Sequence, residues 1–241
     1  MKISVVVPAF NEERLLGESL AQIQAASAAF TRRGWVTERI VCDNNSTDRT
    51  ADVARAAGAA VVFEPVNQIA RARNRGAAAA GGDWLIFVDA DSHPSAELFG
   101  EVAERIESGR CLAGGCTVRL AGRYPVAQAL VALWNGISRA LRWMAGSFVF
   151  CEAEVFRRIG GFSNDLFVGE ELDLSQRLKR LARAERKKIV ILHRHPLLTS
   201  ARKVHLYSPR EHLGFLWKLI LTGGKAKASR ELCRPWYDGR R

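Results

Sequence analysis

Residues 83–93 read Asp-Trp-Leu-Ile-Phe-Val-Asp-Ala-Asp-Ser-His. The apolar run over 84–88 is short, continuous and rich in β-branched and aromatic side chains, which predicts a strand buried on both faces of a parallel sheet. Two glycines precede the run and Pro94 follows its polar end, so the strand is bounded on both sides. Asp89 and Asp91 therefore lie at the carboxyl end of a central strand, where open α/β sheets bind ligands.

The spacing of Asp89 and Asp91 predicts a site for a divalent cation. Residues two apart in an extended chain point to the same side. Paired carboxylates suit a hard cation such as Mg²⁺ or Mn²⁺, which would keep positions free for a diphosphate. An Asp-x-Asp triplet also arises by chance, and turns favour Asp, so the rest of the chain has to support this interpretation.

The preceding sequence predicts a mostly parallel sheet. Strands are expected over 3–7, 38–42 and 60–63, and helices over 12–31, 50–57 and 67–80. Asn11 is the expected N-cap of the first helix, and Ser46 or Thr47 that of the second. This β-α-β order with short connections predicts an α/β fold with right-handed crossovers. Pro8 and Phe10 stand where a dinucleotide fold has its glycine-rich turn, so a dinucleotide site is not expected.

The second half alternates strands and helices less regularly. Strands are expected over 111–120, with a bulge at Gly114 and Gly115, over 146–151 and over 189–192; helices are expected over 95–106, with Ser95 as its cap, over 154–159, from 170 onward and over 208–222. Residues 124–144 are apolar and predict either a pair of packed helices or one helix on a bilayer surface, with Trp134 and Trp143 at headgroup level.

Length and composition fit one globular domain. With 241 residues, the chain is expected to form a single unit over 1–204. Residues 205–241 are expected to form a helix and a basic tail. No transmembrane segment or signal peptide is predicted, and the five cysteines are expected to be reduced cytosolic thiols.

The positive charge is concentrated at one end of the chain. The net charge is +11, and residues 177–241 contain 18 Lys and Arg against 4 Asp and Glu. This asymmetry favours an anionic partner. Nucleic acid is unlikely on this sequence, which contains no zinc-finger or RNP motif. The predicted location is the cytoplasm, with peripheral binding at the inner face of the membrane.

Five spaced motifs now carry a resemblance to a known family. They are Val5-Val6-Val7-Pro8-Ala9-Phe10-Asn11-Glu12, Asp43-Asn44-Asn45-Ser46-Thr47-Asp48, Ala72-Arg73-Asn74-Arg75-Gly76, Asp89-Ala90-Asp91, and Glu170-Glu171 before Arg177-Leu178. In this order and spacing, over about residues 3–183, they resemble the family 2 glycosyltransferases with a GT-A fold. The resemblance implies transfer of a sugar from a nucleoside-diphosphate sugar to an acceptor. It also implies that residues 1–93 form the donor nucleotide half of the domain and residues 94–204 the acceptor and catalytic half.

The resemblance also implies roles for individual residues. Donor-binding residues would be Pro8, Phe10, Glu12, Asp43, Arg73, Asp89, Ala90 and Asp91, with Asp89 and Asp91 also holding the metal. The catalytic base would be Glu171, with Glu170 beside it. The family usually has Glu-Asp at this position, so Asp173 remains a competing base. Asn45 replaces a usual glycine, and asparagine tolerates the same left-handed backbone conformation.

These assignments predict a metal-dependent, inverting transferase. A divalent cation would offset charge developing on the leaving diphosphate. His205 is a candidate third ligand, and Arg202 and Lys203 are candidates to pair with the diphosphate. A single carboxylate base acting on an acceptor hydroxyl inverts the anomeric centre. The acceptor is unknown, and a lipid-linked one is considered.

Two other functions stay open at this point. A nucleotidyltransferase also uses paired aspartates and Mg²⁺, but it would need a glycine-rich basic loop after the first strand. A membrane-surface protein that kept the GT-A fold without catalysis would need none of the carboxylates that this chain contains.

Overall fold

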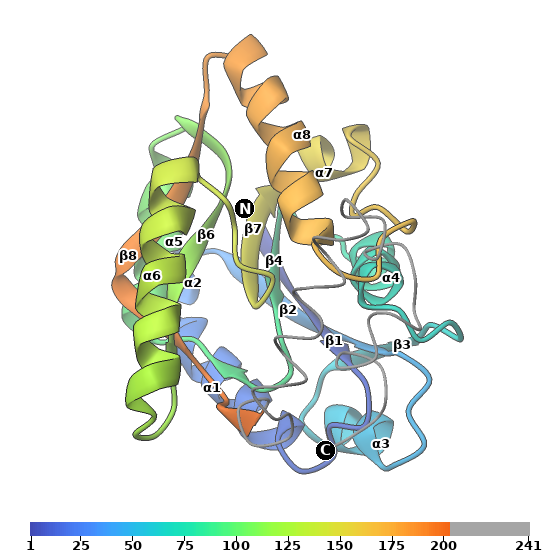
Figure 1. Ribbon diagram of the computed structural model, residues 1–241. Coiled ribbons are helices and arrows are strands. Elements are labelled where there is room, and N and C mark those ends of the chain that lie inside the picture. Colours follow the sequence, from blue (N-terminus) through green and yellow to red (C-terminus); the bar gives the residue numbers. More distant parts are fainter. Residues whose placement is uncertain (203–241) are drawn as a thin grey trace.

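The computed structural model describes residues 1–202, which form an eight-stranded mixed sheet with helices on both faces (Figure 1). The strands are β1 (Lys2–Ala9), β2 (Val36–Asp43), β3 (Ala60–Phe63), β4 (Trp84–Val88), β5 (Ser92–His93), β6 (Cys111–Leu120), β7 (Phe148–Glu152) and β8 (Lys188–Thr199). Their order across the sheet is β3-β2-β1-β4-β7-β6-β8-β5. The predicted α/β class is therefore confirmed.

The N-terminal half is the parallel part of this sheet. β1 pairs with β2 and β4, and β2 with β3, all in parallel. The connecting helices are α1 (Leu16–Ala26), α2 (Ala28–Thr31), α3 (Thr50–Ala56) and α4 (Ile69–Ala79). Every residue of β4 is buried, as its continuous apolar sequence predicts. The carboxyl ends of β1, β2 and β4 consequently meet at one edge.

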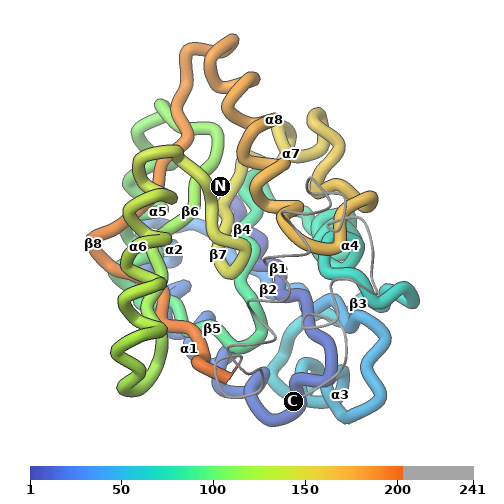
Figure 2. The backbone as a smooth tube through the Cα atoms, in the orientation of Figure 1, coloured from blue at the N-terminus to red at the C-terminus, as the bar shows by residue number. Residues whose placement is uncertain are grey.

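The C-terminal half extends the sheet with antiparallel pairs. β7 is antiparallel to both β4 and β6, whereas β8 is parallel to β6. The helices here are α5 (Ala96–Glu107), α6 (Pro125–Leu141), α7 (Ala153–Arg158) and α8 (Glu170–Ala184). α6 lies at the β8 end of the molecule, away from β3 and α3 (Figure 2). α8 packs on one face of the sheet, together with α4 and α7. There it brings acidic residues toward the end of β4.

Two cores cover the two faces of the sheet. One contains alternate residues of β1 and β4 packed under α1, α2 and α5. The other contains the remaining residues of these strands packed under α4, α7 and α8. The alternation follows from the pleat of each strand, which sends successive side chains to opposite faces.

Helix caps were predicted with mixed success. Ser95 caps α5 as expected, because its Oγ accepts the Leu98 N–H at 3.2 Å. The Asn11 cap is wrong: α1 begins at Leu16, and Asn11 lies in the preceding loop with a positive φ of 53°. Neither Ser46 nor Thr47 caps α3. That helix begins at Thr50.

Three predictions in the second half are corrected. Residues 125–141 form one helix, so the predicted helix pair is wrong. The register shifts of β6 flank Gly114 and Gly115 rather than coinciding with them. β8 continues to Thr199, well past Leu192, and Pro196 falls inside its second shift. Proline lacks an N–H and is tolerated at such irregularities, which is why the sequence pattern ended the strand too early.

Some predictions fall outside the described residues. These are Lys203, His205, Cys233, the helix over 208–222 and the basic tail. The four described cysteines, Cys42, Cys111, Cys116 and Cys151, are buried free thiols. Within residues 1–202, every helix is too short or too polar to cross a membrane.

Candidate active site

The loops that follow β1 and β2 are joined by hydrogen bonds. The backbone N–H of Glu12 donates to Thr50 Oγ1 at 2.7 Å, and that of Glu13 donates to Asp48 Oδ2 at 3.1 Å. Glu12 is only 7% exposed. The loop that contains the predicted donor residue Glu12 is thus held against the segment that follows β2.

The Asp43 motif forms a tight polar turn. Asp43 Oδ1 accepts the Ser46 N–H at 3.0 Å. The Asn44 amide donates to Val66 O at 2.6 Å and accepts the Gln68 N–H at 2.9 Å, so it fixes the loop that leads into α4. Asn45 has φ 64°, which confirms the left-handed conformation expected where the family usually has glycine.

Arg73 connects the end of β4 to the start of α8. Its guanidinium donates to Glu170 Oε1 at 2.6 Å, Asp89 Oδ1 at 3.0 Å and Gly146 O at 2.7 Å. The side chain is fully buried and lies 5.1 Å from the Phe162 ring centroid. Arg73 was predicted as a donor-binding residue. Its burial instead makes it an internal support for two carboxylates.

Electrostatics explain how this arginine is kept charged. Burial disfavours the charged guanidinium, but the carboxylates of Asp89, Glu170 and Glu171 raise the pKa of Arg73 above its usual value. A buried cation among three acids stays ionised. No pattern in the sequence indicated that Arg73 would contact Glu170, which lies 97 residues further along the chain.

Glu171 has the electrostatics expected of a proton acceptor. Loss of water contact, and then the adjacent Glu170 charge, raise its pKa to about 8. The side chain lies beside Gly146, where an added Cβ would come within 3.6 Å of Glu171 Cδ. A carboxyl group with a pKa near neutrality is suited to general acid–base work. Such perturbed groups in a cleft mark candidate functional sites.

Asp173, the competing base, is engaged differently. Its Oδ2 lies 2.7 Å from Arg177 Nη2, and Arg177 Nη1 donates to Ile159 O at 2.7 Å. The ion pair lies one helical turn apart on α8 and faces the Ile159 turn. This geometry favours Glu171 over Asp173.

Asp89 and Asp91 contact different cations. Asp89 lies against Arg73, whereas Asp91 Oδ2 is 3.5 Å from Arg202. Arg202 also forms a bidentate pair with Glu12, at 2.6 and 2.9 Å. A residue expected to contact the diphosphate therefore joins two carboxylates of the predicted donor site. The turn after Val88 separates the two aspartates, so the extended geometry expected from their spacing is not present.

A cavity of about 360 Å³ opens next to Asp91. Tyr124, His93 and Arg202 contribute to its lining. Sequence reasoning missed Tyr124, although its position just before the proline that begins α6 is a signal for a fixed helix start. The cavity thus brings an aromatic ring and a histidine close to Asp91.

The described residues partly fit a divalent cation. Within residues 1–202, His, Cys, Asp and Glu form no group of three or more that could hold a metal. Asp89 and Asp91 have partly exposed side chains, at 27% and 16%. Mg²⁺ in phosphate-transfer sites is commonly held by one or two carboxylates, substrate phosphates and water. Two aspartates are therefore an adequate protein donor set if a diphosphate supplies other ligands.

Comparison with known proteins identifies the family. The sequence profile described as glycosyl transferase family 2 matches residues 4–158. The chain belongs to this family. The matched range includes Glu12, Asp43, Asp89 and Asp91, but it ends before Glu171.

Two relatives with similar sequences are glycosyltransferases by name. An uncharacterized glycosyltransferase of Mycobacterium tuberculosis, Rv0539, is 35% identical over 120 residues, which is 50% of each chain. The dolichol-phosphate mannosyltransferase of Pyrococcus furiosus is 30% identical over 123 residues, 48% of this chain and 33% of the relative. This family 2 chain thus spans about half the length of the mycobacterial relative it matches.

Solved structures share the fold at low identity. S. aureus TarS in complex with UDP-GlcNAc superposes with a TM-score of 0.65 at 19% identity, covering 100% of this chain and 74% of TarS. Glucosyl-3-phosphoglycerate synthase of Mycobacterium tuberculosis, with Mn²⁺, UDP and glucosyl-3-phosphoglycerate, gives 0.60 at 23% identity, covering 94% and 80%. The GT-A fold predicted from the motifs is confirmed.

Proposed function

We propose that this family 2 protein transfers a sugar from a nucleoside-diphosphate sugar to an acceptor, with inversion at the anomeric carbon. The observation that carries the proposal is the Arg73 bridge. It holds Asp89, at the predicted donor end of β4, against Glu170, next to the predicted base. Donor and base sites are thereby fixed relative to each other, and such positioning of reacting groups is a large part of catalysis.

Uridine is the favoured nucleoside of the donor. Both superposed structures described above contain UDP or a UDP sugar. In this chain Asp43 and the loop after β1 would hold the nucleoside, and Asp89 and Asp91 would face the ribose and diphosphate. A divalent cation bound by Asp91, with Asp89 beside it, would stabilise charge on the leaving diphosphate. His205 remains a proposed additional ligand outside the described residues.

Glu171 is the proposed general base. Its pKa of about 8 leaves a useful fraction of carboxylate near neutral pH and gives that carboxylate enough basicity to accept an acceptor hydroxyl proton. Attack from the face opposite the diphosphate inverts the configuration. Asp173 is less suited because its carboxylate already forms an ion pair with Arg177.

The acceptor is proposed to be lipid-linked or membrane-borne. Support comes from the mannosyltransferase relative, whose name refers to a lipid phosphate, dolichol phosphate. The basic C-terminal sequence is a second support. We propose that this acceptor presents a hydroxyl group, whose proton Glu171 removes. A phosphate oxygen is already ionised and needs no base, so unchanged turnover in Glu171→Gln would contradict a hydroxyl acceptor.

The competing functions receive less support. A nucleotidyltransferase needs a glycine-rich basic loop after β1, but this loop contains Glu12 and Glu13. A non-catalytic protein has no use for the raised pKa of Glu171.

Release of UDP from UDP sugars tests the proposal. The full chain should release UDP with Mn²⁺ or Mg²⁺ and a membrane extract as acceptor source, and release should stop with EDTA. NMR of the product should show an inverted anomer. Retention of configuration, or the absence of UDP, GDP and other nucleotide release across a donor panel, would contradict it.

A further inference from the structure

One face of α6 exposes an apolar stripe, defined here as Val126, Leu130, Leu133, Ile137 and Leu141. Their exposed fractions are 77%, 63%, 63%, 38% and 46%. Intervals of three and four residues place them along one side of a helix. The opposite side packs on the sheet, where Asn135 bonds both backbone groups of Val118. The stripe is therefore a surface and not a poorly packed core.

The tryptophans expected to contact lipid are not part of this stripe. Trp134 packs against the core of the sheet. Trp143 lies under Lys179, whose Nζ is 5.8 Å from the ring centroid. The aliphatic stripe is the apolar surface that α6 presents.

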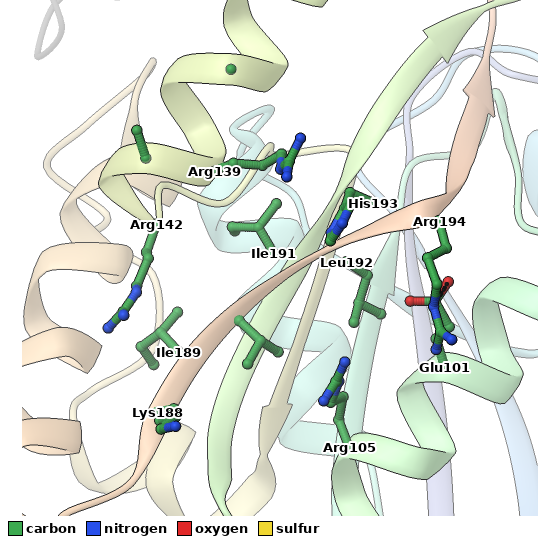
Figure 3. Close-up of a pocket in the computed structure, with 13 residues that line it drawn as sticks. Glu101, Arg105, Arg139, Arg142, Lys188, Ile189, Ile191, Leu192, His193 and Arg194 are labelled. Carbon is green, nitrogen blue, oxygen red and sulfur yellow. Dashed lines mark ion pairs between the residues drawn. The ribbon is translucent and has the colours of Figure 1, made fainter.

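A basic pocket lies beside the stripe. It has a volume of about 670 Å³ and lies between α5, α6 and the strand β8. Figure 3 shows Arg105 coming from α5, Arg139 and Arg142 from α6 and Lys188 from β8 around the same stretch of strand. We use the name basic pocket for the space lined by these four cations. Gly136 and Ala140 also line it, so the pocket adjoins the stripe on the same helix.

The four cations lack carboxylate partners within residues 1–202. Arg194, at the rim of the pocket, is paired and lies 3.3 Å from Glu101. None of the ion pairs of the described residues includes Arg105, Arg139, Arg142 or Lys188. Unpaired positive charges that line one pocket repel one another and attract an anion.

Neighbouring groups strengthen this field. Burial, and then the charges of Arg183 and Arg142, lower the pKa of Lys179. No Asp or Glu occurs in the sequence between Glu107 and Glu152, so α6 and the segments on either side of it bring no negative charge. Residues 203–241 are themselves net basic and are poorly suited as the counterion.

We propose that α6 docks on an anionic phospholipid bilayer, with the apolar stripe at the boundary of headgroups and acyl chains and a lipid phosphate in the basic pocket. A bilayer satisfies both features at once, because it supplies apolar and anionic surface side by side. A soluble phosphate would leave the stripe in water, and a second copy of this chain would oppose like charges. Docking does not depend on sugar transfer.

Co-sedimentation of the full chain with vesicles tests the proposal. Binding should appear with phosphatidylglycerol–phosphatidylcholine vesicles, be weak with phosphatidylcholine alone and fall with salt. Arg105→Gln with Arg139→Gln should weaken binding by roughly 25-fold, about fivefold for each cation near the surface. The matched control, Arg32→Gln with Arg55→Gln, removes the same charge from exposed positions just after α2 and on α3 and should change binding less than about twofold by loss of long-range attraction.

Further arms separate the alternatives. Leu130→Ser with Leu133→Ser should also reduce vesicle binding, while UDP binding and thermal unfolding stay unchanged as controls of folding. Equal losses in the control and pocket variants would overturn the site. Saturable binding of inorganic phosphate in calorimetry without vesicle binding would assign the pocket to a soluble anion. A dimer in sedimentation velocity that Leu130→Ser with Leu133→Ser dissociates would assign the stripe to a second copy.

Discussion

At the scale of single residues, the proposed chemistry depends on Glu171. Glu171→Gln keeps the size of the side chain but cannot accept a proton. We expect turnover to fall by about 10² or more with donor affinity little changed, since loss of a general base acts on the transition state. Asp173→Asn should have a smaller effect, because its carboxylate pairs with Arg177. Steady-state kinetics with a UDP sugar measure both, and a larger loss in Asp173→Asn would move the base to that residue.

The same glutamate should reduce stability at high pH. Its pKa is raised from 4.5 to about 8, so between these values the folded state holds a proton that the unfolded state has lost. The free energy of unfolding therefore falls as pH rises through this window. Glu171→Gln removes the dependence, and its stability advantage over the unsubstituted protein should grow from about pH 5 to about pH 8. Urea unfolding across this range measures it.

Glu38→Gln is the control of opposite sign. Burial of Glu38 acts to raise its pKa, but hydrogen bonds from Lys2 and Ser4 hold the pKa below the ordinary value. Its charged form is stabilised by folding, so this substitution should lower stability above about pH 5. A constant difference between Glu171→Gln and the unsubstituted protein over the whole range would contradict the raised pKa.

Arg73 should be the most costly arginine to replace. Arg73→Met would leave the buried Glu170 and the partly buried Asp89 without their cation. Removing one partner of a buried charged network destabilises by about 3–5 kcal/mol. Arg55→Met removes an exposed pair with Asp52, and such surface pairs contribute about 0–1 kcal/mol. Chemical unfolding compares the two, and equal effects would show that the Arg73 network adds no stability.

At the scale of elements, the glycine of the Ala72–Gly76 motif sets the approach of α4 to β1. A Cβ added at Gly76 would lie 2.4 Å from Val6 Cγ1. We expect Gly76→Ala to destabilise by about 1–3 kcal/mol through overpacking. Gly100, inside α5, has no heavy atom within 4 Å of an added Cβ. Gly100→Ala should stabilise by about 0.5–1 kcal/mol, because alanine is the better helix former. Thermal unfolding of the Gly76→Ala and Gly100→Ala variants tests whether packing or helix propensity governs stability at each position.

At the scale of the whole molecule, ligand binding should report on the joined site. Arg202 connects the end of the described chain to Glu12 across 190 residues, so we expect nucleotide binding at the proposed donor site to involve both ends of the domain. UDP with Mn²⁺ at about 100 times its Kd should add about 2.7 kcal/mol of stability. EDTA should remove most of that gain.

Asp91→Asn separates the metal from the nucleotide in this measurement. The variant should keep its fold and some UDP binding but lose the difference between Mn²⁺ and EDTA in thermal shift. Asp83→Asn is a matched control at the other end of β4, where the carboxylate accepts the Lys2 N–H at 2.7 Å. An undiminished metal effect in Asp91→Asn would place the cation elsewhere.

Much of the donor half follows from the sequence alone. The run over 84–88, the strands on either side and the alternation with helices are local patterns, and local patterns specify strands, helices and the edge where loops meet. Asn45 could be predicted to be left-handed because few residue types tolerate that conformation. The family motifs similarly indicated Glu171 through its spacing from Arg177 and Leu178.

The tertiary structure decided what these residues contact. Arg73 became a buried support, Arg202 reached Glu12 and Asp91, and β8 ran through Pro196, because each depends on partners distant in sequence. The raised pKa of Glu171 likewise arises from burial and a neighbouring charge, which no spacing encodes. Residues 124–144 show the same limit. Their apolar sequence predicted either a pair of packed helices or one helix on a bilayer surface, and only packing against the sheet determined that Trp134 turns inward while Leu130 and Leu133 stay exposed.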